Sequence, residues 1–123
     1  MNTTQIAARL VELCRQGQYE QAQNELYADD AVSLEMPGLP PEALGNVSGL
    51  DAIREKGRRW ADNIAEIHGG SVSEPVIAGD WFSVAMSIDA TYKDRGRTPM
   101  EEICVYQVRD GKIVHEQFFY PMG

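Results

Sequence analysis

The sequence predicts an α+β domain with helices in the first half of the chain and antiparallel strands in the second half. Two patterns and the chain length lead to this class. Apolar residues recur at helical spacing up to residue 64, whereas apolar and polar residues alternate from residue 71 onward. The 123 residues fit a single domain spanning 1–123, with enough length to bury a core.

Three helices are expected before the sheet. The first has Thr3 or Thr4 as its N-cap and stops at Gly17, and the second runs from about residue 19 to residue 28. Residues 31–36 predict a short strand, and residues 37–47, rich in proline and glycine, predict a loop. The third helix starts after Ser48, reaches Ile64 and ends before the glycine pair at 69–70.

Four strands are expected next, at residues 72–78, 81–92, 101–108 and 112–120, with a charged loop at 93–99. Residues 109–111 predict a three-residue hairpin loop that pairs Val108 with Lys112 and Cys104 with Glu116. One face of the hairpin then carries Glu102, Cys104, Tyr106, Val114, Glu116, Phe118 and Tyr120. The other carries Ile103, Val105, Ile113, His115, Gln117 and Phe119. Because both faces are largely apolar, we expect one to face the helices and the other to face a second subunit.

Charge and motifs exclude several classes of function. The net charge is −8 and the eleven Lys and Arg residues are scattered, which argues against a nucleic-acid partner or an anionic membrane surface. There is no membrane-length apolar run and no signal-peptide pattern, so a cytoplasmic protein is expected. Cys14 and Cys104 lie far apart and are expected to be free thiols. No metal-binding or cofactor-binding motif occurs, so neither a metal nor a cofactor is expected.

Glu116 is the first candidate for a catalytic residue. The predicted register puts it among aromatic residues and diagonal to Glu102, and burial and a like charge both raise a carboxyl pKa. A carboxylate adjusted in this way can act as a general base or acid, although acids at strand ends are also common on surfaces. His68 is a second, weaker catalytic candidate, with a plain helix-terminal histidine as the alternative. The expected ligand-binding residues are Tyr27, Met36, Trp60, Met86, Glu102, Cys104, Tyr106, Phe118 and Tyr120. Tyr27 and Glu35 are candidates for closing the mouth of the cavity, a placement that residue spacing leaves open.

Three segments resemble a known family in their order and spacing. They are LYADDAV at residues 26–32, GLDAIR at 49–54 and DGKIV at 110–114. Together they resemble SnoaL-like or ketosteroid isomerase-like proteins of the nuclear transport factor two-like superfamily. The resemblance implies a cone in which a curved antiparallel sheet wraps around about three N-terminal helices and encloses a deep, mostly apolar pocket. It also implies homodimers through the outer sheet face and an inward orientation of the face that carries Cys104 and Glu116.

The catalytic residues of that family do not carry over. The tyrosine of the steroid isomerases falls at Leu10, their base before a proline at Met36, and their second acid at Cys104. The late-strand aspartate of the polyketide cyclases falls at Phe118. Neither reaction can therefore be transferred by matching residues, which leaves Glu116 as the favoured acid or base.

Two classes of function remain open at this point. The first is a cofactor-independent isomerase, cyclase or hydrolase-type enzyme that uses acid/base chemistry on a small apolar carbonyl compound. Glu116 would move the proton, and Tyr106, Tyr120 or His68 would stabilise the oxyanion. The alternative is a non-catalytic domain, because a fold does not determine a function. Such a domain would bind a small ligand, dimerise to interact with a protein, or serve only as a structural dimer-forming domain.

Overall fold

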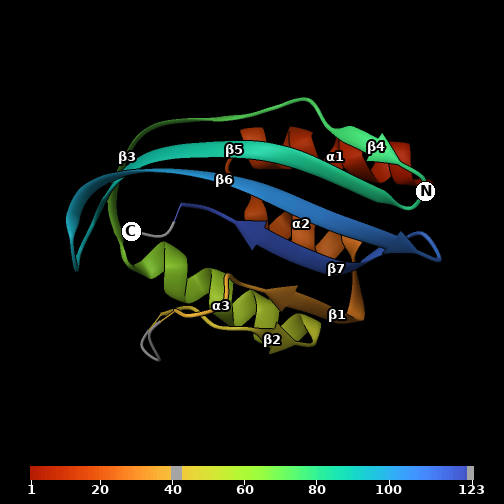
Figure 1. Ribbon diagram of the computed structural model, residues 1–123, viewed down its shortest axis with the longest axis horizontal. Helices are drawn as coiled ribbons and strands as arrows, with labels where there is room; N and C mark the ends of the chain where they lie inside the picture. The colour runs from red at the N-terminus through yellow and green to blue at the C-terminus, as the bar shows by residue number, and fades with distance from the viewer. Residues whose placement is uncertain (40–42, 122–123) are drawn as a thin grey trace.

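The computed structural model describes residues 1–39 and 43–121. Its helices are α1 (Thr3–Arg15), α2 (Tyr19–Leu26) and α3 (Leu50–Asp62). Its strands are β1 (Tyr27–Leu34), β2 (Val47–Ser48), β3 (Ile64–Val72), β4 (Val76–Ala78), β5 (Trp81–Tyr92), β6 (Gly96–Arg109) and β7 (Lys112–Phe119). The helices lie against one face of a curved, unclosed sheet, which confirms the predicted α+β cone (Figure 1). Residues 40–42 of the predicted loop lie outside the described part of the chain.

The helix boundaries differ slightly from the prediction. Asn2, rather than Thr3 or Thr4, is the N-cap of α1, because its side chain accepts a hydrogen bond from the Gln5 amide while the Gln5 side chain accepts one from the Asn2 amide. The second helix ends at Leu26, since Tyr27 already has the extended backbone that begins β1.

No helix within residues 1–39 and 43–121 is long and apolar enough to cross a membrane.

The strands follow the order β2-β1-β7-β6-β5-β3, and β4 pairs with β5. All pairs are antiparallel except β1 and β7, which run in parallel, so the sheet is mixed rather than purely antiparallel as predicted. This pairing brings the first strand beside the last one and sets Ser33 of β1 opposite Glu116 of β7. Residues far apart in the sequence therefore share one region of the inner face.

The strand β3 was not predicted. The helix was expected to continue to Ile64 and the glycine pair to break the chain, but α3 ends at Asp62 and β3 runs through both glycines. Gly70 permits a close approach to β5, because a Cβ atom there would lie 2.6 Å from the carbonyl oxygen of Ser87. The predicted strand at residues 72–78 is in fact the end of β3 followed by β4, and part of the predicted charged loop extends β6 back to Gly96.

The predicted register of the last hairpin is also wrong. Arg109 pairs with Lys112 across a two-residue turn, in which Asp110 and Gly111 both have the positive φ that a type I′ turn needs. A β-bulge at Val114 then adds one residue to β7, so that Tyr106 rather than Cys104 lies opposite Glu116.

The bulge reverses the change of face that the shorter turn would cause. Cys104, Tyr106, Glu116 and Phe118 therefore stay on one face, and Cys104 pairs with Phe118. Between the turn and the bulge the predicted faces do not hold: Ile113 is fully buried in the core instead of lying on the outer face.

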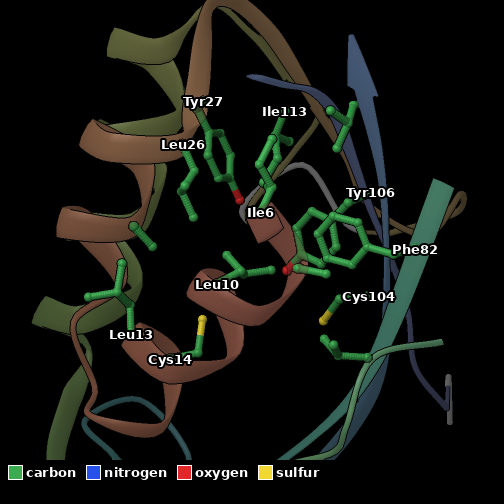
Figure 2. Close-up of a cluster of buried hydrophobic side chains, with 14 of the residues drawn as sticks. Ile6, Leu10, Leu13, Cys14, Leu26, Tyr27, Phe82, Cys104, Tyr106 and Ile113 are labelled. Atoms are coloured by element: carbon green, nitrogen blue, oxygen red, sulfur yellow. The ribbon is translucent and has the colours of Figure 1, made fainter. Parts of the chain in front are cut away.

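The core fills the space between the helices and the inner face of the sheet. Phe82 and Tyr106 stack with ring centroids 4.9 Å apart and pack toward Leu10 of α1 (Figure 2). Tyr27 approaches from the opposite side, with its hydroxyl oxygen directed into the interior. The polar groups described next lie on the same inner face.

Candidate active site

Three carboxyl groups and one amine lie close together inside the cone. Glu35 directly follows β1, Lys56 comes from α3, Glu102 from β6 and Glu116 from β7. The positive charge of Lys56 lowers the pKa of each of the three carboxyl groups. The negative charge of Glu116 raises the pKa of both Glu35 and Glu102. We call these four residues the carboxyl cluster. Three carboxyl groups around the Lys56 amine form an arrangement in which protons can move.

Glu116 is the most deeply buried member of the cluster, with only 4% of the residue exposed. The hydroxyl group of Tyr27 donates a hydrogen bond to its Oε1 atom. Ser33 lies opposite on β1, but its hydroxyl oxygen meets no hydrogen-bond partner within the described part of the chain. Burial raises the pKa of Glu116, and the neighbouring Ser33 hydroxyl, the Tyr27 hydroxyl and the Lys56 charge act against that rise.

Glu35 and Lys56 form a buried ion pair, with Lys56 Nζ 3.7 Å from Glu35 Oε1 and side-chain exposures of 7% and 10%. Burial raises the pKa of Glu35 to about 7, with further contributions from the Glu102 and Glu116 charges, while Lys56 lowers it. The second oxygen of Glu35 has no hydrogen-bond partner among residues 1–39 and 43–121. Glu35 is therefore the carboxyl group that titrates near neutral pH and has an oxygen free for another group.

Glu102 completes the cluster beside the Cys104 thiol, whose sulfur atom lies 3.4 Å from Glu102 Oε1. Burial raises the pKa of Glu102, the thiol hydrogen bond opposes this, and the Glu116 charge adds to it. Burial also raises the pKa of the Cys104 thiol, and it raises that of Cys14 to about 12. Both thiols are free and buried, as expected, so they are protonated at neutral pH and poor nucleophiles.

A groove of about 690 Å³ lies where β6 continues past the end of β7. It is lined by Met36, Met86, Glu102 and Tyr120, four of the predicted ligand-binding residues, and by residues of the outer face such as Ser87 and Ile103. Glu102 belongs both to this groove and to the carboxyl cluster, so the groove reaches the cluster there. The deep apolar pocket implied by the resemblance stays a prediction.

The other predicted ligand-binding residues divide into two sets. Tyr27, Tyr106 and Phe118 lie around the cluster, and the Phe118 ring centroid is 5.4 Å from Lys56 Nζ. Trp60 instead packs edge-to-face on Tyr19, with ring centroids 5.7 Å apart.

The position of His68 corrects its interpretation as a catalytic partner of Glu116. His68 is exposed on β3, and its Nε2 atom lies 2.7 Å from the hydroxyl oxygen of Thr91. Thr91 alternates with the buried Ala90 and Tyr92 along β5, so it points to the outer face of the sheet. The sheet therefore lies between His68 and the inward-facing Glu116.

Lys56 is the site residue that sequence reasoning missed. The buried face of α3 contains Leu50, Ile53 and Lys56 at three-residue intervals, so a lysine occupies a position where an apolar residue is expected. That departure from the helical pattern is the signal that could have identified it. Its partner Glu35 was expected only at the mouth of a cavity.

Comparison with known proteins places the chain in a family. The model of the SnoaL-like domain matches residues 1–120. A crystal structure from Mesorhizobium loti, described as a candidate SnoaL-like polyketide cyclase with carbohydrate phosphatase in brackets, is 37% identical with a TM-score of 0.89, covering 98% of this chain and 100% of that chain.

Two more distant structures share the fold alone. An NTF2-like protein from Burkholderia thailandensis is 23% identical with a TM-score of 0.79, covering 98% of this chain and 92% of that chain. A candidate isomerase from Bacillus subtilis is 18% identical with a TM-score of 0.76, covering 98% of this chain and 90% of that chain. No curated protein matches the sequence. The family match over nearly the whole chain and the close similarity to the first structure show that this protein belongs to the SnoaL-like family.

Proposed function

We propose that this protein is a cofactor-independent enzyme that moves a proton on a small apolar carbonyl compound, as an isomerase or cyclase does. The observation that carries the proposal is the buried carboxyl group of Glu35, whose pKa is raised to about 7. About half of this group is ionised at neutral pH, so it can accept a proton and return it within one reaction cycle. The similarity to proteins described as a cyclase and an isomerase supports the same class of chemistry.

Glu35 and Glu116 are given different roles. Glu35 is the proposed base, because its Oε2 atom has no partner within the described residues. Glu116, which the sequence alone favours as the base, already accepts a hydrogen bond from Tyr27 and is almost fully buried. Its raised pKa favours the protonated form, which can donate a hydrogen bond to the oxygen that gains charge when a carbonyl compound is deprotonated.

The test is exchange of the hydrogen atoms next to a carbonyl group. The protein is incubated in D₂O with a panel of small apolar ketones, and loss of their α-proton signals is followed by proton NMR. This assay reports proton removal even where the complete reaction is unknown. We expect exchange above the buffer rate for at least one ketone, and we expect Glu35→Gln to abolish it, because an amide cannot accept the proton.

A matched control shows whether the loss of exchange is specific to Glu35 or follows from removing any one carboxyl group. Glu55 lies on the same helix as Lys56 but is exposed, so Glu55→Gln should retain the exchange. Exchange that survives in Glu35→Gln but not in Glu116→Gln would move the role of base to Glu116. A ketone that raises the melting temperature without any exchange would refute the enzyme and favour the alternative, a ligand-binding module.

We also propose that the outer face of the sheet forms a homodimer. Ile103, Phe119 and Trp81 lie on this face and are 52%, 41% and 39% exposed. A second copy of the chain would cover these side chains and remove apolar surface from water. The proposal agrees with the dimers that the family resemblance implies.

A further inference from the structure

The geometry points to Lys56 as a nucleophile that forms an imine with the carbonyl carbon of a bound aldehyde or ketone. The inference deepens the proposed function, on which it rests for the carbonyl nature of the ligand. It adds a covalent step and a residue whose chemistry can be tested separately from proton transfer. Four observations support it: the place of Lys56 on its helix, its contacts, its carboxyl neighbour and its contrast with the other lysines.

Lys56 lies on the wrong side of α3 for a structural lysine. Asp51, Glu55, Arg58 and Arg59 of this helix are exposed, whereas Lys56 is only 6% exposed and shares the buried face with Ile53. Burying an ammonium group costs free energy that a leucine or methionine at this position would avoid. A buried lysine at an apolar position therefore indicates a role in the site rather than in packing.

The contacts of Lys56 hold the amine loosely. Within residues 1–39 and 43–121 its one hydrogen bond goes to the carbonyl oxygen of Gly45, at 3.3 Å. The nearest Glu35 oxygen is 3.7 Å away, which is beyond a normal hydrogen bond, and the Phe118 ring centroid is at 5.4 Å. An ammonium group has three N–H donors, so this environment satisfies only part of its capacity. The amine is held in place, and it keeps enough hydrogen-bonding capacity to contact a ligand.

The carboxyl neighbour provides the proton transfers that imine formation needs. Glu35 first accepts a proton from the Lys56 ammonium, and the free amine then attacks the carbonyl carbon to form a C–N bond. The carbonyl oxygen takes up a proton from the Glu35 carboxyl and becomes a hydroxyl group. The carboxyl group of Glu116 protonates that hydroxyl group, which leaves as water. The nitrogen, which still carries two protons after the attack, passes one of them to the Glu116 carboxylate, and a protonated imine remains. Addition of water reverses these steps and regenerates the free lysine.

The imine would assist the proton removal already assigned to Glu35. A protonated imine withdraws electrons from the neighbouring carbon more strongly than a neutral ketone, because it carries a full positive charge beside that carbon. Glu35 is again a carboxylate once it has protonated the carbonyl oxygen, so it can remove the α-proton. One pair of residues thus accounts for activation of the ligand and for its deprotonation.

The other two lysines supply internal controls. The chain contains three lysines, and both Lys93 and Lys112 are exposed. Lys112 donates a hydrogen bond to the carbonyl oxygen of Glu25, and Lys93 lies in the turn between β5 and β6. Neither belongs to the carboxyl cluster.

The experiment is trapping of the imine. The protein is incubated with cyclohexanone, acetophenone or cinnamaldehyde, the imine is reduced with sodium cyanoborohydride, and the adduct is located by mass spectrometry of peptides. We expect at least one of these probes to add predominantly to the peptide containing Lys56. Lys93→Arg and Lys112→Arg should retain this adduct, and Lys56→Met should lose it.

Lys56→Arg is a second variant that keeps the positive charge beside Glu35 but has no amine, so it should also lose the adduct. Circular dichroism checks that both Lys56 variants are folded. Equal labelling of all three lysines, or no adduct with any probe, would overturn the inference. The two proposals can fail separately. Exchange of α-protons without an adduct on Lys56 refutes the imine and leaves the acid/base enzyme intact, whereas an adduct without exchange refutes proton transfer and leaves the nucleophile.

Discussion

Replacement of Lys56 by methionine should strongly raise the pKa of Glu35. The variant removes the one positive charge of the carboxyl cluster while keeping a long side chain. At the observed separation of 3.7 Å, two unit charges in an effective dielectric of about 20 attract by about 4.5 kcal/mol. That energy corresponds to about 3 pKa units. Because the pKa of Glu35 starts at about 7, the carboxyl group of the variant should stay protonated throughout the neutral range.

The assay is carbon-13 NMR of protein labelled at the glutamate side-chain carboxyl groups. The Glu35 signal is assigned from the spectrum of Glu35→Gln and followed as a function of pH. Lys56→Arg retains the positive charge and should leave the titration near that of the unsubstituted protein. If the pKa of Glu35 stays the same or falls in Lys56→Met, then the Lys56 charge does not stabilise the Glu35 carboxylate, and the account of the cluster is wrong.

Three further predictions concern stability and assembly. The pKa of Glu35 is higher in the folded protein, about 7, than its ordinary value of 4.5, so the folded state binds the proton more tightly. This group should therefore contribute about 3 kcal/mol of stability below about pH 4.5 that is lost as the pH rises through 7. Urea unfolding at a series of pH values should show this loss in the unsubstituted protein relative to Glu35→Gln, and parallel curves would contradict it. Tyr27→Phe leaves an oxygen of the buried Glu116 carboxyl group without its hydrogen-bond donor and should lower the free energy of unfolding by about 1–3 kcal/mol, measured in the same way. Unchanged stability would show that this bond contributes nothing net. For the proposed homodimer, Ile103→Asp places a charge in the interface, so the variant should sediment as a monomer where the unsubstituted protein sediments as a dimer. A variant that remains dimeric would exclude the outer face as the interface.

The inward orientation of Glu116 was predicted through a register that proved incorrect. The prediction assumed a three-residue loop and a regular ladder, whereas the structure has a two-residue turn and a bulge at Val114. Both arrangements place Glu116 on the same face. Alternation along a strand reports only whether the number of residues is odd or even, so it could not distinguish the two. It misplaced Lys112 and Ile113, which lie between the turn and the bulge and pair with Arg109 and Val108.

The features that the sequence did not predict depend on contacts between distant segments. The glycine pair at 69–70 resembles a chain break, and only the approach of Ser87 on β5 makes a glycine necessary within a strand there. Lys56 lies 21 positions after Glu35, on a different element, and helical periodicity alone does not identify its partner. A residue that breaks a local pattern can mark a site, but its chemistry follows from neighbours that tertiary structure supplies.

The parallel pairing of β1 with β7 has a consequence for biosynthesis. Tyr27 and Glu116 are 89 positions apart, so the ribosome must add β7 before the two can meet. Until then, one edge of β1 has only open backbone hydrogen-bonding groups, and such an edge can pair with another chain. Contacts of such long range also slow folding, because a large loop must close first. A nascent chain that stalls before β7 would therefore be a substrate for chaperones, and ordering of the carboxyl cluster would be among the last events in maturation.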